Sequence, residues 1–179
     1  MSSANGINVS AVFPPFCAKH ASECIGLIEE GIPGESLLIV ERLKGGFACI
    51  HTVTRQSVVS GLVAVSNTTE YENTNVPSLS YWRGKWTQVS GSAVVDIRAE
   101  QNGLFAEGDA TWTTPNGQVT NGGYFVRQIL PYRRFAKTTA VAAKDDCEIN
   151  FTLLDEVLVL VDNHQCGGEN VSFSGFYRK

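Results

Sequence analysis

Histidine, the side chain that most often binds metals or shuttles protons, occurs three times in this chain. His20, His51 and His164 lie far apart in the sequence and fall in different expected elements. We therefore predict no metal site from them. His51 lies in a strand-like run, where we expect a half-buried structural role, and His164 lies in a turn, where we expect it to be solvated.

The sequence contains no recognisable catalytic motif. It has no G-x-S-x-G nucleophile elbow, no H-E-x-x-H zinc motif, no P-loop and no G-x-G-x-x-G dinucleotide fingerprint. Four carboxylates could form acid–base pairs for glycoside chemistry: Asp96, Glu107, Asp109 and Glu148. Alternation places them on the solvent face of their strands, and nothing forces them into a pair. We expect no enzymatic activity and no cofactor.

Five cysteines supply the remaining reactive groups: Cys17, Cys24, Cys49, Cys147 and Cys166. Cys147 opens a strand-like run and Cys166 follows the next one, so an antiparallel hairpin would bring the two together. We predict a Cys147–Cys166 disulfide, which implies an oxidising compartment. Two buried free thiols in a cytosolic protein are the alternative. Among the other three, both Cys24–Cys49 and Cys17–Cys49 remain open.

The peptide 162–168, DNHQCGG, is the most distinctive short segment. Its side-chain oxygens and glycine backbone suit a binding loop, with Asp162, Asn163 and His164 as the candidate contacts. The alternative is a plain turn, in which Asp and Asn bond their own backbone and glycine supplies a positive φ. We favour the turn and keep the three residues as candidates.

Aromatic side chains suggest a second kind of site. Trp82, Trp86, Trp112 and Tyr124 could line the cavity of a small-ligand carrier. They could equally fill a core, because aromatic side chains bury large apolar areas. We favour the core.

We expect short runs that alternate apolar and polar residues to position all these side chains. After residue 82, about six or seven strand-like runs are joined by short turns such as Asn102-Gly103, a strong hairpin signal. Such meanders commonly close into an up-and-down barrel or pack as a sandwich. The fold class is therefore all-β, with an antiparallel β-barrel or sandwich of about six to eight strands at the C-terminus.

We divide the chain into four parts. Residues 1–34 are expected to form a tail and a short helix, 35–70 a small β unit, 71–81 a polar linker and 82–179 the barrel domain. The first ten residues lack the basic start and apolar stretch of a signal peptide.

Charge restricts the partners. Only 18% of the residues are charged, below the usual ~25%, and the net charge is −4. No more than two basic residues adjoin, so we expect neither nucleic acid nor an anionic membrane as the main partner, although folding could still gather scattered cations on one face. No run of about 18 apolar residues occurs, so we expect no membrane insertion.

Two segments resemble known families. Residues 36–66, with "SLLIVERLKGGFACIH" and "SGLVAVS", resemble the bacterial SH3-like module, although Phe47 and Leu62 stand where tryptophans are usual. The peptides "WRGKW", "GDATW", "NGGYF" and "DNHQCGGENVSFSGFY" resemble the C-terminal β domain of uncharacterised exported proteobacterial proteins. The second resemblance covers about 98 residues and implies export without an enzymatic activity.

We therefore expect a non-enzymatic binding protein of the bacterial envelope, periplasmic or secreted, with a cytoplasmic location as the alternative. Its partner would be another protein. By analogy with exported proteins of similar small β folds, it would be an inhibitor or immunity protein that blocks a hydrolase or toxin through its loops. The alternative function is the small-ligand carrier described above.

Overall fold

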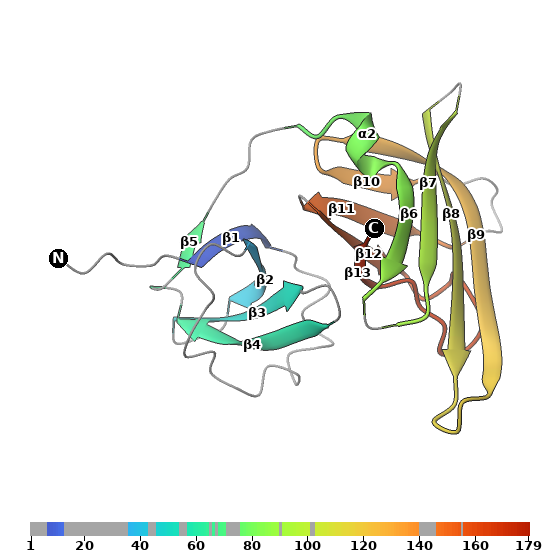
Figure 1. The fold of residues 1–179 in the computed structure, drawn as a ribbon, viewed down its shortest axis with the longest axis horizontal. Coiled ribbons are helices and arrows are strands. Elements are labelled where there is room, and N and C mark those ends of the chain that lie inside the picture. Colours follow the sequence, from blue (N-terminus) through green and yellow to red (C-terminus); the bar gives the residue numbers. More distant parts are fainter. Residues whose placement is uncertain are drawn as a thin grey trace. The chain divides into compact units, whose positions relative to one another are not determined.

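The computed structural model divides the chain into two compact units, residues 1–74 and 75–179 (Figure 1). The division falls inside the segment 71–81 that we expected to be a linker. The residues that the structure describes are 7–12, 36–42, 46–53, 57–64, 66, 68–70, 76–89, 91–100, 103–139, 146–154 and 156–179.

The N-terminal unit contains a five-stranded sheet in the order β4-β3-β2-β1-β5. Its strands are β1 (Ile7–Val12), β2 (Ser36–Arg42), β3 (Phe47–Val53), β4 (Val58–Ala64) and β5 (Thr68–Glu70). Strands β2, β3 and β4 form an antiparallel meander, as expected. The resemblance to an SH3-like module remains a prediction. Strand β1 pairs in parallel with both β2 and β5.

Strand β1 corrects the expectation of a tail at the N-terminus. The run INVSAV alternates apolar and polar residues, and it extends the sheet between β2 and β5. The short helix expected near residues 17–30 lies outside the described residues. The centre of the sheet is β3, where Ala48, Cys49, Ile50 and His51 are all buried. His51 is thus more deeply buried than expected.

The C-terminal unit is a closed barrel in the order β10-β11-β12-β13-β6-β7-β8-β9. A short helix, α2 (Leu79–Trp82), precedes these eight strands: β6 (Gly84–Gln88), β7 (Val94–Glu100), β8 (Gly103–Thr113), β9 (Val119–Tyr132), β10 (Phe135–Thr138), β11 (Ile149–Leu154), β12 (Val157–Asp162) and β13 (Gly175–Arg178). Each strand pairs antiparallel with its neighbour in the sequence, and β13 closes on β6. The expected all-β class is confirmed, as a barrel rather than a sandwich.

Antiparallel alternation gives the barrel two different ends (Figure 1). What we call the helix end carries α2, the β7–β8, β9–β10 and β11–β12 turns, and the C-terminus. What we call the loop end carries the β6–β7 turn, the tip of the β8–β9 hairpin and the long β12–β13 connection, residues 163–174. Strands β8 and β9 are the longest, and their hairpin projects beyond the other strands at the loop end.

Side chains on the inner faces of the strands form one buried cluster. Its largest members, each less than 2% exposed, include Trp82, Trp86, Phe125, Phe151 and Tyr177. Large side chains pack against small ones: a Cβ on Gly108 would lie 2.2 Å from the ring of Phe125. Burial of aromatic side chains contributes about 1.5–3 kcal/mol each, so this filled interior is the main source of barrel stability.

Candidate functional site

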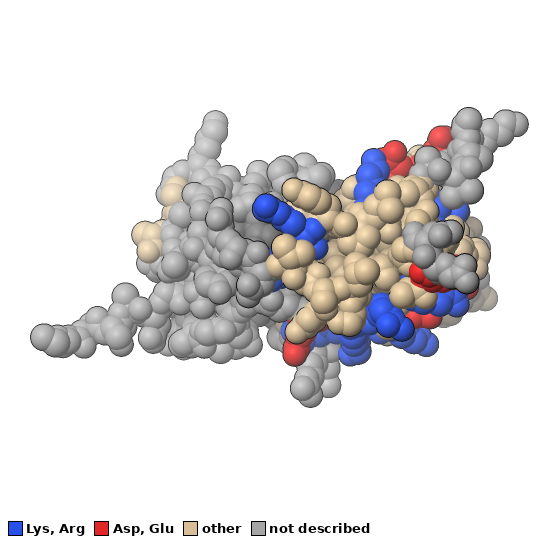
Figure 2. All heavy atoms as spheres, turned by 90° about the horizontal axis from the view of Figure 1, so that it is seen from above, with Lys and Arg blue, Asp and Glu red and all other residues tan. Residues whose placement is uncertain are grey.

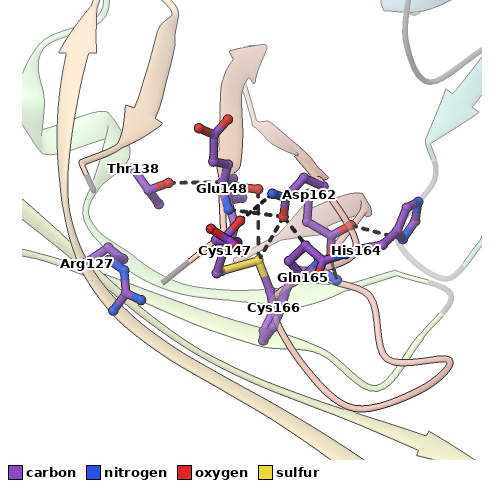
Figure 3. Close-up of a disulfide and its surroundings, with 12 residues drawn as sticks. Arg127, Thr138, Cys147, Glu148, Asp162, His164, Gln165 and Cys166 are labelled. Atoms are coloured by element: carbon purple, nitrogen blue, oxygen red, sulfur yellow. Dashed lines mark hydrogen bonds and ion pairs between the residues drawn. A yellow bond between two sulfur atoms is a disulfide. The ribbon is translucent and has the colours of Figure 1, made fainter. Parts of the chain in front are cut away.

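The loop end contains the predicted disulfide. Cys147 and Cys166 are bonded, with their Cα atoms 4.6 Å apart and 19 positions apart in the chain. Both are buried, at 8% and 5% exposure. The bond ties the β12–β13 connection to the residues that lead into β11 (Figure 3). Cys49 is also disulfide-bonded, but the expected partners Cys17 and Cys24 lie outside the described residues.

Asp162, a candidate binding residue, instead has a structural position. Its side chain is fully buried at the end of β12. The carboxylate accepts hydrogen bonds from the backbone N–H of Phe173 at 2.6 Å and from the hydroxyls of Ser172 at 3.1 Å and Ser174 at 2.8 Å. Three donors offset the cost of burying its charge. Asp162 therefore holds the far end of the β12–β13 connection against the barrel.

Tyr177 extends this buried network into the core. Its hydroxyl donates to the carbonyl oxygen of Phe173 at 2.7 Å. Burial, together with the charge of Asp162, raises the pKa of Tyr177 far above its ordinary value. Phe173 packs edge-on against Phe125, with ring centroids 4.8 Å apart. The connection thus closes the loop end of the barrel with an aromatic side chain.

Asn163 also serves the loop itself. Its side-chain oxygen accepts hydrogen bonds from the backbone N–H of Glu148 at 3.1 Å and of Gln165 at 3.2 Å. Its amide donates to the carbonyl oxygen of Asp146. The bonds with Glu148 and Asp146 cross from the β12–β13 connection to the residues that lead into β11, beside the disulfide, and the bond with Gln165 closes the turn. Asn163 therefore fits the turn that we favoured from the sequence.

His164 is the candidate that remains accessible. Its side chain is 52% exposed, and its Nδ1 lies 3.5 Å from the buried Asp162 carboxylate (Figure 3). The backbone φ of His164 is +61°, a left-handed conformation typical of tight turns. The residues from Gln165 to Asn170 are exposed except for Cys166. A rigidly held turn therefore presents one imidazole and a short polar segment to solvent.

An open groove of about 520 Å³ lies beside this turn. One wall is the first half of β9, Gly122–Arg127, and the other is Cys147 with Gln165–Gly168. The two walls meet tightly at Gly123, where a Cβ would lie 2.7 Å from the carbonyl oxygen of Cys166 and 3.0 Å from the Cα of Gly167. Glycine is required there because two backbones approach closely.

The groove exists because β10 is much shorter than β9. The part of β9 that pairs with β10 is Ile129–Tyr132. No described strand therefore lies beside the first half of β9 on that edge. The loop meets this edge through a hydrogen bond from Gly168 N–H to the carbonyl oxygen of Gly122, at 3.2 Å. Further along, Arg127 Nη1 donates to the carbonyl oxygen of Val126 at 2.8 Å.

The four aromatic candidates do not share a cavity. Trp82 and Trp86 belong to the buried cluster, and the indole N–H of Trp86 donates to the carbonyl oxygen of Trp82 at 2.8 Å. Trp112 packs against the edge of that cluster. Tyr124 points outward, is 58% exposed and borders the groove. Its hydroxyl donates to Glu107 at 3.0 Å, and this hydrogen bond raises the pKa of Tyr124.

The carboxylates lie on the outer surface of the barrel, as the alternation predicts. Glu107 pairs with Arg98 and with the Tyr124 hydroxyl, while Glu148 pairs with Lys137 at 2.8 Å. Within the described parts of the chain, no three His, Cys, Asp or Glu side chains cluster as metal ligands would. In the same described parts, no helix is both long enough and apolar enough to cross a bilayer.

Gly122, Gly123 and Arg127, which shape the groove, were not among the predicted site residues. One signal was present, because paired glycines inside a strand-like run indicate a close backbone approach. Arg127 gave no such signal, since its position in β9 depends on the length of β10.

Comparison with known proteins adds no relative to this picture. No family model matches the chain, and neither a curated protein nor a solved structure matches it.

Proposed function

We propose that this protein is a non-enzymatic binding protein of the bacterial envelope, which contacts a partner protein through the loop end of its barrel. The observation that carries the proposal is the fixed turn at 163–170, held by the Cys147–Cys166 disulfide and the buried Asp162 beside an open groove. A loop fixed in advance loses little conformational entropy when it binds, so more of its contact energy appears as affinity.

The filled interior favours recognition on the outside of the barrel. Carriers of small ligands enclose most of the ligand in a cavity lined by apolar side chains. Here Trp82 and Trp86 occupy the interior as core residues, and Tyr124 faces solvent. The groove is open and bordered by glycine backbone, which suits a protruding protein segment better than an enclosed small molecule.

The projecting β8–β9 hairpin supports an inhibitory role. Together with the fixed turn it forms a protrusion at one end of the barrel, with Asn121 of β9 donating to the carbonyl oxygen of Glu169 at 2.6 Å. A protrusion of this kind can enter the cleft of a hydrolase or a toxin and block it. We therefore place the protein among inhibitors or immunity proteins.

Disulfide chemistry supports the envelope. The Cys147–Cys166 bond and the bonded state of Cys49 both require an environment that allows disulfides to persist. Periplasmic and secreted locations meet this requirement, whereas the cytosol of most bacteria keeps thiols reduced.

The test is capture of a partner from an envelope extract with the full chain and two charge variants. Gln165→Lys/Glu169→Lys changes exposed side chains at the loop end, where the hydrogen bonds of both residues involve backbone atoms only. Ala99→Lys/Glu100→Lys makes the same charge change at the opposite end of the barrel, where both residues are exposed at the end of β7. We expect the partner to be lost with the first variant and retained with the second. Equal capture by both would contradict a loop-end interface.

Inhibition is measured next, with the captured partner in its own activity assay. We expect the wild-type chain to reduce the activity in proportion to complex formation. A complex whose activity equals that of the free partner would remove the inhibitor role while leaving the binding role in place.

A further inference from the structure

Exposed apolar side chains gather at the helix end, away from the loop-end groove. Nine large hydrophobic residues are exposed among the described residues, and six of them lie at or beside this end. They are Val76, Leu79, Tyr81, Leu130, Tyr132 and Phe135, each between 53% and 71% exposed. Three belong to α2 or the segment that leads into it, and three to the β9–β10 hairpin.

Basic residues accompany them. Among the described residues, the helix end carries five basic residues: Arg83, Arg133, Arg134, Arg178 and Lys179. The described acidic residues at this end are two, Glu100 and Glu156. Glu156 is already paired with Arg178 at 3.8 Å. Figure 2, which looks down on this end, shows uncharged surface with Lys and Arg side chains, and some Asp and Glu side chains, along its edge.

Two of the cations contact aromatic residues. The guanidinium of Arg133 lies 5.7 Å from the ring centroid of Tyr132. The ammonium of Lys179 donates to the carbonyl oxygen of Tyr81 at 2.9 Å and lies 4.6 Å from the ring centroid of Trp86. The positive charges are therefore held beside the exposed apolar side chains rather than spread away from them.

The loop end has the opposite charge. Four exposed carboxylates lie toward it: Asp109, Asp146, Glu148 and Glu169. Lys137 pairs with Glu148 and offsets one of these charges. Among the described residues of the barrel, cations thus predominate at the helix end and anions at the loop end. A negatively charged surface would attract the helix end and repel the loop end.

We propose that the helix end docks on an anionic phospholipid surface, with its apolar side chains in the headgroup region and its cations against lipid phosphates. Aromatic and aliphatic side chains flanked by Lys and Arg are what proteins use to lie on a bilayer without crossing it. The apolar side chains stand on α2, on the segment before it and on the strand ends beside the β9–β10 turn, all toward one end of the barrel. The cations beside them are complementary to lipid phosphates, and this favours a membrane surface as the occupant. The loop end would then face away from the membrane.

Vesicle co-sedimentation of the full chain tests the proposal. The probes are vesicles of equal parts phosphatidylglycerol and phosphatidylcholine, and vesicles of phosphatidylcholine alone. We expect stronger binding to the anionic vesicles, and weaker binding to them as salt screens the charges. Equal binding to both, or binding to neither, would overturn the proposal. Binding to heparin without binding to vesicles would also overturn it, in favour of a soluble polyanion.

Variants locate the surface. Arg83→Gln/Arg133→Asn removes two cations, and asparagine tolerates the positive φ of +56° at position 133. We expect the partition coefficient for anionic vesicles to fall about 30-fold, from about 1 kcal/mol for each cation. Tyr132→Ser/Phe135→Ser removes exposed aromatic side chains, and we expect a fall of about tenfold or more.

Arg98→Gln is the control, because Arg98 is exposed on the side of the barrel and pairs with Glu107, near the middle of β8. We expect it to bind anionic vesicles within about twofold of wild type, far less than the loss of about 1 kcal/mol for a cation at the bilayer. A loss equal to that of the helix-end variants would show that charge alone, without this surface, governs binding and would overturn the proposal. Unchanged tryptophan fluorescence confirms that each variant retains the folded barrel.

Discussion

Replacement of Asp162 by alanine should loosen the loop end more than any other single polar substitution described here. The substitution removes the acceptor for three hydrogen bonds and leaves the backbone N–H of Phe173 buried without a partner. Residues 163–174 would then be tied to the barrel mainly by the disulfide and by the packing of Phe173.

The magnitude follows from the individual bonds. Hydrogen bonds to a charged group contribute about 1.5–3 kcal/mol each, and an unsatisfied buried N–H costs about 1–3 kcal/mol. The freed hydroxyls of Ser172 and Ser174 are half-buried and can turn to water, so their loss counts for less. We expect Asp162→Ala to lower the free energy of unfolding by about 3–4 kcal/mol, and Asp162→Asn, which keeps one acceptor, by about 1–2 kcal/mol.

Urea unfolding followed by tryptophan fluorescence measures this loss in the barrel alone, because all three tryptophans belong to it. The midpoint should move without a change in slope. Asp146→Ala is the matched control, since Asp146 is exposed and only its backbone oxygen accepts from Asn163; its effect should stay within about 0.5 kcal/mol. A loss below about 1 kcal/mol for Asp162→Ala would refute the role given to this carboxylate.

Three further predictions concern the disulfide, the close backbone approach at Gly123 and the buried Tyr177. Cys147→Ser/Cys166→Ser should lower barrel stability by about 3 kcal/mol, and a reducing agent should then have no further effect on the barrel transition; an equal response to reductant in the variant would contradict this. Gly123→Ala should destabilise by about 1–3 kcal/mol because its Cβ meets backbone at 2.7 Å, whereas Gly122→Ala, with only an Ala110 oxygen at 3.8 Å, should be nearly neutral; thermal melts of both variants decide. Tyr177 has a raised pKa in the folded state, so its contribution to stability is complete below about pH 10 and is lost as the pH rises further. Tyr177→Phe should be about 1 kcal/mol less stable at neutral pH and should show a shallower alkaline loss, measured by urea titration at each pH.

Local patterns in the sequence were sufficient for most of the barrel. Val95, Ile97 and Phe151 are buried at every-second-residue positions of their runs, because an antiparallel strand with one solvent-exposed face repeats every two residues. The cysteine pair followed from a hairpin whose register could be read from its turn. Strand β1 was missed because its partners, β2 and β5, lie far away in the sequence, and a six-residue run followed closely by Pro14-Pro15 carries little local signal for a strand.

The site was harder to predict than the fold. Asp162 was a candidate binding residue or a turn residue, since carboxylates are rarely buried and no local pattern reveals donors that come from residues 172–174. The groove depends on the different lengths of β9 and β10, which is a property of the closed barrel rather than of either strand. The sequence did favour the correct reading of Asn163, because asparagine commonly bonds backbone atoms within turns.

Hydrogen–deuterium exchange of the chain, alone and with its captured partner, tests the loop-end interface most directly. We predict that complex formation slows exchange at Gly122–Arg127 and Gln165–Gly168, the two walls of the groove. Exchange in the β9–β10 turn should remain unchanged, because that turn lies at the helix end. Slower exchange confined to the β9–β10 turn, with the groove walls unaffected, would contradict the proposed binding surface.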